Sequence, residues 1–174
     1  MANPHKTRGT AWESAIRDFL NRFLGLVDET GALRDPMSGD NIRRAAQEGA
    51  RDVGDIHAAP FIIEAKDVAS RAVPTWLRQA EVEAVHAGFP HGVVVHKTRR
   101  APVHAGRVHF TVRTWTRVRL ALGHTSRNTA ELYGCTFTVR GLDTDRWYVS
   151  MSLWDFASLL ADYRAHSGVA RALR

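Results

Sequence analysis

Asp55, Glu64 and Lys66 are the residues whose types and spacing are best suited to chemistry. Glu64 and Lys66 end an apolar, strand-like run, and Asp55 lies nine residues before Glu64 in the stretch GDIHAAPFIIEAKD. Side chains alternate across a strand, so Glu64 and Lys66 are expected on the same face. An acidic residue and a lysine at this spacing indicate either a common surface ion pair or a site that acts on a charged group.

The pairing of Asp55 with Glu64 favours a metal site. A hairpin that turns at Ala59-Pro60 places residues whose numbers sum to 119 opposite one another, and Asp55 and Glu64 form such a pair. Two facing carboxylates repel each other unless a cation lies between them. Mg²⁺ prefers oxygen ligands, so the backbone carbonyl of Ala65 is the natural third ligand.

Glu13 is a further candidate. A helix is expected over Gly9–Leu26, because Trp12, Ile16, Phe19, Leu20, Phe23 and Leu24 recur at spacings of three and four. On a helical wheel Glu13 falls inside this apolar stripe, where a carboxylate is costly unless it is paired or bound to metal. Glu13 is therefore either a margin residue that reaches solvent or part of the site.

A second helix is expected after Pro74, with Trp76, Leu77, Ala80 and Ala84 on its apolar face. Gln79 and Glu83 lie one turn apart on this helix. They either edge the same site or form a helical surface pair, which the spacing alone favours.

The remaining segments complete an α/β pattern. A long loop is expected over Asp28–Gly49, and a final helix over Leu153–His166 that Ser152 and Asp155 cap. Strands are expected over Asp52–Ile56, Pro60–Ala65, His91–Lys97, Arg107–Trp115, Cys135–Val139 and Trp147–Met151. The order predicts one domain over residues 1–174 with a central mixed β-sheet flanked by helices. Its core spans about residues 6–100, and a β-β-α extension spans about 101–174.

The charge distribution indicates a polyanionic partner. The chain carries a net charge of +6, and no acidic residue occurs between Glu83 and Glu131. The basic residues in that interval are Lys97, Arg99, Arg100, Arg107, Arg113, Arg117, Arg119 and Arg127. They form either a solvated face or a surface for phosphate, and the strands within the interval favour the second.

Several function classes are disfavoured. The single cysteine, Cys135, excludes an intramolecular disulfide and a cysteine-rich zinc site, and the nine histidines lack a metal-binding spacing. The sequence contains neither a P-loop nor a dinucleotide-binding motif, so no nucleotide cofactor is expected. No apolar run is long enough to cross a membrane, and no signal peptide precedes the first helix, so we expect a cytoplasmic protein.

With Glu13, Asp55, Glu64-Ala65-Lys66 and Gln79 in these positions, the chain resembles the PD-(D/E)XK nuclease superfamily. Within it, the likeness is to archaeal-type Holliday junction resolvases and related phage resolvases. Their Lys-Gly-x-x-x-Glu-like helix is matched loosely by Arg8–Glu13, and GVVVHKTRR matches their apolar strand that ends in basic residues. Gly54 replaces the proline of the family's Pro-Asp, and the likeness covers about residues 6–100.

The resemblance implies a restriction-endonuclease-like core and a role for each site residue. Asp55, Glu64 and the Ala65 carbonyl would hold Mg²⁺ or Mn²⁺, and Glu13 would hold or orient a second ion or its waters. Lys66 would position the attacking water and offset charge on the scissile phosphate, and Gln79 would edge the site. Contacts to DNA are expected from Arg8, Arg34, Arg43, Arg44, Lys97, Arg99 and Arg100.

The implied activity is metal-dependent, structure-specific DNA endonuclease cleavage at four-way junctions, in DNA recombination and repair. A homodimer is expected, because two symmetric nicks need two sites. If the protein is phage-encoded, it would act in the host cytoplasm. The alternatives are another nuclease of the superfamily, restriction-like or a recombination and repair exonuclease, and a non-catalytic basic DNA-binding module.

Overall fold

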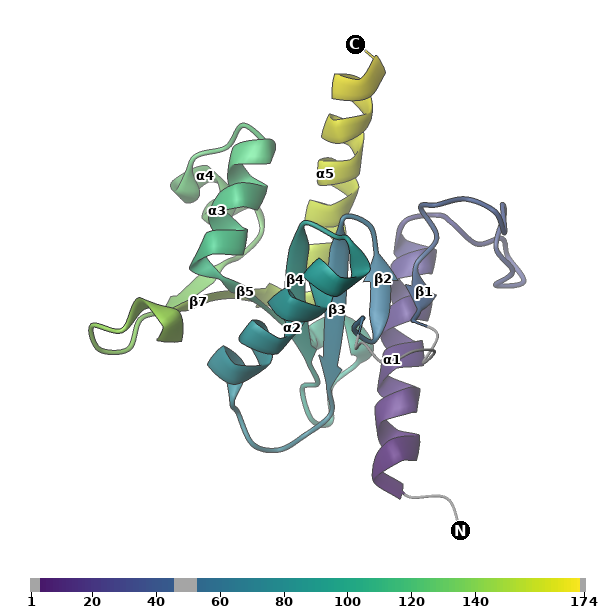
Figure 1. Ribbon diagram of the computed structural model, residues 1–174. Coiled ribbons are helices and arrows are strands. Elements are labelled where there is room, and N and C mark those ends of the chain that lie inside the picture. Colours follow the sequence, from purple (N-terminus) through teal and green to yellow (C-terminus); the bar gives the residue numbers. More distant parts are fainter. Residues whose placement is uncertain (1–3, 46–52, 173–174) are drawn as a thin grey trace.

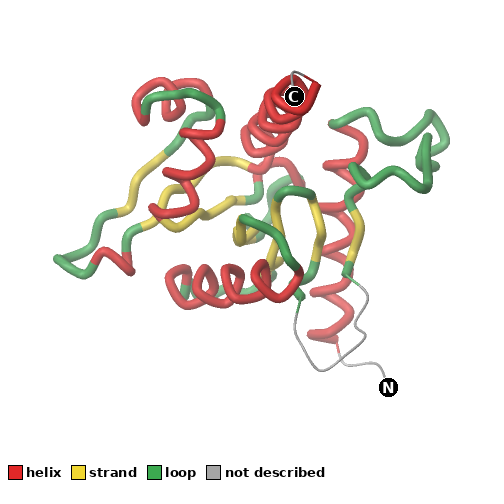
Figure 2. The backbone as a smooth tube through the Cα atoms, turned by 45° about the horizontal axis from the view of Figure 1, so that its top comes forward, coloured by secondary structure: helices red, strands yellow, loops and turns green. Residues whose placement is uncertain are grey.

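A seven-stranded mixed sheet forms the centre of the computed structural model, which describes residues 4–45 and 53–172. Helices α1 (Pro4–Phe23) and α5 (Leu153–Ala172) pack on one face of the sheet, and α2 (Val73–Ala87) packs on the other (Figures 1 and 2). The predicted α/β class, a central mixed sheet flanked by helices, is confirmed.

The strand order across the sheet is β1-β2-β3-β4-β5-β7-β6. The strands are β1 (Arg43–Arg44), β2 (Ile56–Ala58), β3 (Phe61–Lys66), β4 (His91–His96), β5 (Arg107–Thr111), β6 (Thr136–Thr138) and β7 (Tyr148–Ser152). Only the β3–β4 pair is parallel within this sheet, and α2 provides the crossover that a parallel pair requires. The sheet therefore has short strands at both edges, of two residues in β1 and three in β6.

The apolar stripe of α1 lies against the sheet as predicted. Trp12, Ile16 and Leu20 are buried, and the Trp12 indole N–H donates to the Val95 carbonyl at 3.2 Å. The helix is shifted toward the N-terminus relative to the predicted Gly9–Leu26.

Helix α2 approaches β4 with its backbone. A Cβ atom added to Gly92 would lie 2.2 Å from the Ala80 carbonyl oxygen, so only glycine fits there. Pro74 lies in the first turn, as predicted, and Gly88 ends the helix in a left-handed conformation. This close contact fixes the height of α2 above the sheet.

Two predicted strands are wrong in extent. The strand expected over Asp52–Ile56 is instead β2, which begins at Ile56; Asp52 lies outside the described residues. Gly54 interrupts the extended chain with a φ of +79°, and a Cβ atom there would lie 2.3 Å from Ile62 Cγ2.

The strand expected over Arg107–Trp115 ends at Thr111, where α3 (Val112–Ala121) begins. The Thr111 hydroxyl accepts a hydrogen bond from the Thr114 N–H at 3.0 Å and caps this helix. A second unpredicted helix, α4 (Ser126–Leu132), follows. The C-terminal segment therefore adds β5, β6, β7 and three helices to the fold, with 3₁₀ turns at Val103–Ala105 and Thr144–Arg146, rather than a β-β-α unit alone.

The last helix starts where predicted and runs beyond His166 to Ala172, with the Asp155 N–H donating to the Ser152 hydroxyl at 3.0 Å. The predicted loop over Asp28–Gly49 holds through Ala45, apart from β1; its last residues lie outside the described ranges. Within residues 4–45 and 53–172, no helix is long and apolar enough to span a membrane.

Candidate active site

The β2–β3 hairpin has the predicted register. Ile56 pairs with Ile63 and Ala58 pairs with Phe61, on either side of the turn at Ala59-Pro60. Asp55 lies directly before β2, and its Oδ2 accepts a hydrogen bond of 2.7 Å from the Ala65 N–H. The hairpin therefore brings the Asp55 carboxylate to the end of β3.

Asp55 and Glu64 form a strained pair of acids. Glu64 is only 5% exposed, and Asp55 is half-buried. Burial raises the pKa of Asp55 to about 7, with further rises from the Glu64 charge and, to a smaller extent, the Glu13 charge. Burial also raises the pKa of Glu64 to about 7, against the lowering effect of Lys66. Both groups are thus poised to lose a proton to a cation near neutral pH.

Lys66 completes the predicted constellation. Its Nζ forms an ion pair and hydrogen bond with Glu64 Oε1, and both side chains are largely buried. Glu64 and Lys66 lie on the α2 face of β3, because Phe61 and Ile63, the alternate residues, point into the α1–α5 core. An ammonium therefore stands beside two acidic groups in one partly buried place.

Glu13 and Arg44 meet at the edge of this site. Glu13 is 14% exposed at its side chain, and its Oε2 accepts hydrogen bonds from Arg44 Nε at 2.9 Å and Nη2 at 2.5 Å. Strand β1 positions Arg44, since the next residue, Ala45, donates its N–H to the Asp55 carbonyl at 2.9 Å. Glu13 thus lies near Asp55 as predicted, and Arg44, predicted as a DNA contact, is its ion-pair partner.

Gln79 reaches the site only through Glu83. The Gln79 Nε2 donates to Glu83 Oε1 at 2.8 Å, so the two residues form the expected helical pair, but Glu83 is buried rather than at the surface. Glu83 itself is buried on the sheet side of α2, and its charge helps to raise the pKa of Glu64. Glu83 therefore edges the site, which is the alternative that the helical spacing alone did not favour. Its position opposite Gly54 could not be read from the helix pattern.

The described residues do not include a metal site built from three side chains. Among the described residues, no cluster of three or more His, Cys, Asp or Glu side chains is arranged to hold a metal ion. The predicted set consists of three carboxylates, Asp55, Glu64 and Glu13, and the Ala65 carbonyl; Glu13 is paired with Arg44, which leaves Asp55 and Glu64 as the two adjacent acids. These two acids fit a divalent cation, because both are buried beside further negative charge and their pKa values are raised for that reason.

Two of the other predicted DNA contacts, Arg34 and Arg43, lie in the segment between α1 and β2. Arg34 and Arg43 donate to carbonyls of their own loop, Arg34 Nε to Val27 at 3.0 Å and Arg43 Nη2 to Pro36 at 2.5 Å. Arg100 is exposed, and the Arg8 side chain lies outside the described residues. Arg34 and Arg43 are therefore bound within their own loop rather than beside the acids.

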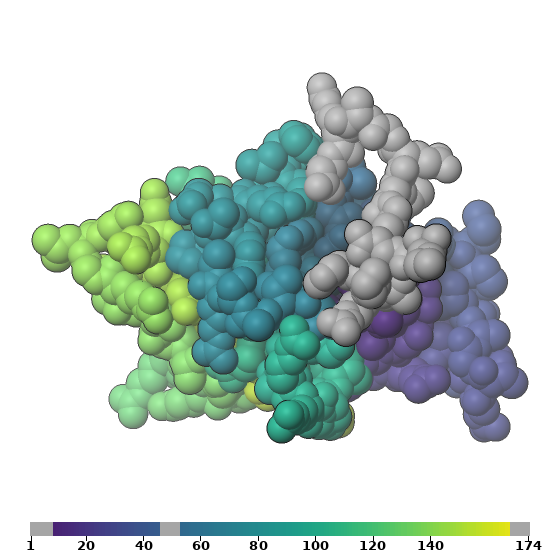
Figure 3. All heavy atoms as spheres, turned by 90° about the horizontal axis from the view of Figure 1, so that it is seen from below, coloured from purple at the N-terminus to yellow at the C-terminus, as the bar shows by residue number. Residues whose placement is uncertain are grey.

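Lys97 and Arg99 lie closer to the candidate site. The Lys97 N–H donates to the Lys66 carbonyl at 2.9 Å, whereas the Lys97 side chain lies on the α1 face of the sheet, with its Nζ 5.5 Å from the centre of the Trp12 ring. Lys97 Nζ and Arg99 Nη2 both face the Asp67 carboxylate, at 2.8 and 3.6 Å. Figure 3 shows the segments that follow β3 and β4 next to each other at this end of the molecule.

Comparisons with protein-family models, with curated proteins and with solved structures find no match for this chain. The candidate site therefore rests on its own geometry: two adjacent buried acids, a lysine bound to one of them, and further acids from α1 and α2.

Proposed function

We propose that the chain is a metal-dependent endodeoxyribonuclease with branched DNA, most specifically the four-way junction, as its substrate. One observation carries the proposal: Asp55 and Glu64 are buried together with raised pKa values, and Lys66 is hydrogen-bonded to Glu64. A binding surface for phosphate gains nothing from buried acids, because they repel it. Acids that hold a cation against a phosphodiester resolve this conflict.

Each residue of the candidate site has a defined role in this proposal. Asp55, Glu64 and the Ala65 carbonyl would hold Mg²⁺ or Mn²⁺, which when bound polarises the phosphoryl oxygen and lowers the pKa of water. Lys66 holds the attacking water in line with phosphorus and offsets negative charge that develops on the phosphate oxygens. Glu13, kept in place by Arg44, orients water on the α1 side of the site.

The preference for four-way junctions comes from the sequence resemblance, and it brings with it a homodimer with two sites related by a two-fold axis. The excess of positive charge supports a DNA substrate of either kind, branched or duplex.

The test is cleavage of a four-way junction, a flap, a duplex and a single strand by the purified protein, with Mg²⁺ and with EDTA. We expect paired nicks near the junction centre in Mg²⁺ and none in EDTA. Glu64→Gln and Lys66→Met are each expected to slow single-turnover cleavage about 100-fold or more. Glu131→Gln removes a carboxylate that is exposed on α4 and paired with Arg127, and it serves as the matched control.

The outcomes separate the alternatives. Cleavage of plain duplex at an equal rate would favour another nuclease of the same superfamily. Metal-independent binding without cleavage of any substrate would refute the enzyme proposal.

A further inference from the structure

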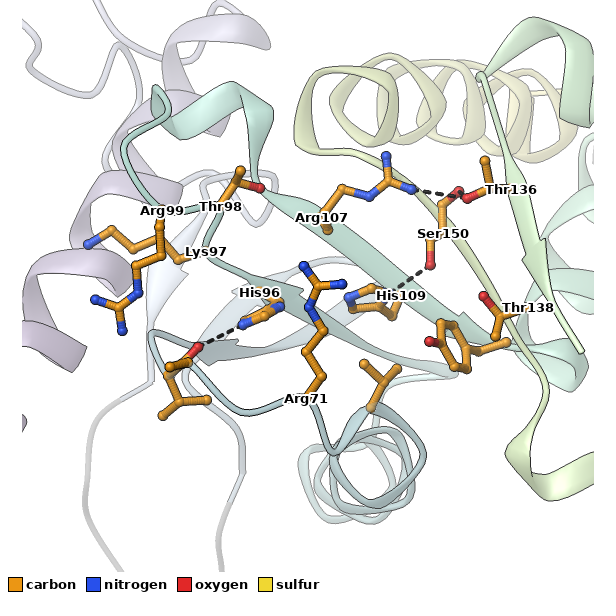
Figure 4. A pocket seen from close by; sticks show the side chains of 14 residues that line it. Arg71, His96, Lys97, Thr98, Arg99, Arg107, His109, Thr136, Thr138 and Ser150 are labelled. Atoms are coloured by element: carbon orange, nitrogen blue, oxygen red, sulfur yellow. Dashed lines mark hydrogen bonds between the residues drawn. The ribbon is translucent and has the colours of Figure 1, made fainter. Parts of the chain in front are cut away.

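A cationic cavity lies on the same face of the sheet as the candidate site. It has a volume of about 610 Å³, and β4, β5, β6, β7 and the loop before α2 form its walls (Figure 4). We call it the arginine cavity and define it by Arg71, Arg107, His109, Thr138, Tyr148 and Ser150. Volumes of this size are typical of small-ligand sites.

The arginine cavity is lined by cations and hydroxyl groups. Arg107 Nη2 donates to the Thr136 hydroxyl at 3.0 Å, and Arg71 extends from the loop toward His109 (Figure 4). Neither guanidinium forms an ion pair with a carboxylate of the described residues, and no described acidic side chain lines the walls. The cavity therefore has positive charge that its own walls do not offset.

His109 provides an independent sign of a ligand. The ring is 7% exposed, and its Nδ1 lies 2.7 Å from the Ser150 hydroxyl. Its buried Nε2 has no hydrogen-bond partner in the described part of the chain, which is unusual for a buried polar atom. Burial and the charges of His96, Arg107 and Arg71 lower the pKa of His109 to about 3. The neutral ring can take the tautomer in which Ser150 donates to Nδ1, and Nε2–H is then free to donate to an anion.

The strand register connects the cavity with the candidate site. Glu64 pairs with Val94 and Val94 pairs with His109, so Glu64 and His109 share one row of the sheet, two strands apart. Strand spacing makes that separation about 10 Å. In the next row Lys66, His96 and Arg107 are aligned in the same way, at the edge where β3 and β4 end. One bound strand of nucleic acid can therefore contact both places.

We propose that the arginine cavity binds a phosphate group of the DNA strand that extends beyond the cleaved bond, with Arg71 and Arg107 holding the phosphate and His109 donating to it. The group that the two guanidinium groups would bind is a phosphate, which either the DNA backbone or free inorganic phosphate can supply. Arginine suits this role, because its planar group donates two parallel hydrogen bonds to phosphate. The half-buried Tyr148 ring, 5.5 Å from that of His109, offers a surface for the attached nucleoside. The assignment to DNA rests on the proposed function; the anion site itself does not.

The experiment measures binding in EDTA, where cleavage does not interfere. A labelled single-stranded oligonucleotide and a labelled four-way junction are titrated with the full chain over a range of salt concentrations. Arg71→Gln, at an exposed loop position, and Arg107→Gln are each expected to weaken binding about three- to tenfold. They are also expected to reduce the salt slope for the single strand by about 0.7 for the lost contact. Arg17→Gln is the matched control: it removes the same charge from α1, outside the cavity, where Arg17 pairs with Asp18.

A second arm uses inorganic phosphate, followed by the NMR signals of the His109 ring. Weak phosphate binding that DNA displaces, together with weaker DNA binding by both cavity variants, supports the proposal. A different result would overturn the DNA assignment: the cavity variants lose phosphate binding, but their DNA affinity equals that of Arg17→Gln. The cavity would then be a site for small anions only. Variants equal to the control in both arms would refute the cavity as an anion site. If the chain cleaves no DNA, the proposed function fails, and the cavity result in EDTA is still read independently.

Discussion

Asp55→Asn should stabilise the metal-free protein at alkaline pH, although it removes a carboxylate from the candidate site. Asparagine has nearly the same shape, and its Oδ1 can still accept the hydrogen bond that the Ala65 N–H gives to Asp55. What the substitution removes is the repulsion between Asp55 and Glu64 and the cost of burying the Asp55 charge. The gain in folding free energy should therefore report the electrostatic strain in the acid pair.

The magnitude follows from the raised pKa. A rise from the ordinary value of 3.8 to about 7 corresponds to about 4 kcal/mol at about 1.36 kcal/mol for each pKa unit. Part of this is shared with Glu64, which also relaxes when its neighbour is neutral, so we expect a gain of about 2 kcal/mol at pH 8. The folded protein binds the Asp55 proton more tightly than the unfolded chain does. The wild type therefore loses stability as pH rises from about 4 to about 7, and the advantage of the variant shrinks as pH falls through that window.

Urea denaturation in EDTA, at about pH 8 and about pH 4.5, measures the difference between variant and wild type. The comparison with wild type is necessary because buried His91 and His109 act in the opposite sense. Their pKa values are lowered to about 4 and about 3, so they reduce stability in both proteins as pH falls below about 6.5. Asp18→Asn, at an exposed position on α1, is the control and should change the free energy of unfolding by less than about 0.5 kcal/mol.

The same denaturation experiment with added Mg²⁺ tests whether Asp55 helps to hold the ion. Added Mg²⁺ should stabilise the wild type and leave Asp55→Asn nearly unchanged, because the variant lacks one of the two carboxylates that would hold the ion. If Asp55→Asn is destabilised equally at both pH values, Asp55 acts only as a hydrogen-bond acceptor and the reasoning from repulsion is wrong.

Two further substitutions test separate parts of the structure. Glu13→Gln should slow single-turnover cleavage about tenfold or more and weaken Mn²⁺ binding; full activity would leave Glu13 as a structural partner of Arg44 alone. Gly92→Ala should lower the free energy of unfolding by about 3 kcal/mol, since its methyl group meets the backbone of α2 at Ala80. Thermal denaturation measures this loss, with Gly39→Ala, in open space on a loop, as the control. A neutral Gly92→Ala would show that α2 is free to move away from the sheet.

Sequence patterns within a few residues were enough to predict two parts of the site, the β2–β3 hairpin and the buried face of α1. The register that brings Asp55 to β3 depends on a two-residue turn, and the common face of Glu64 and Lys66 depends on strand alternation alone. The buried stripe of α1 was equally readable, because its period of three to four residues continues over several turns.

Contacts between distant segments could not be predicted. Arg44 pairs with Glu13 across 31 residues, and Glu83 faces Glu64 only because the crossover sets α2 over β3. Helix α3 was missed for a different reason. Its β-branched residues continue the alternation of β5, and the change to helix depends on one capping hydroxyl, that of Thr111.

The two short edge strands limit how this protein can associate with itself. A second chain that extended the sheet could pair with only two residues at β1 or three at β6, which is too short a ladder to hold two chains together. The exposed Phe137 side chain on β6 adds apolar surface without lengthening that ladder. A stable pair of subunits must therefore be held by contacts between side chains on helices and loops. The same brevity gives the sheet little capacity to template fibrils when the protein is concentrated.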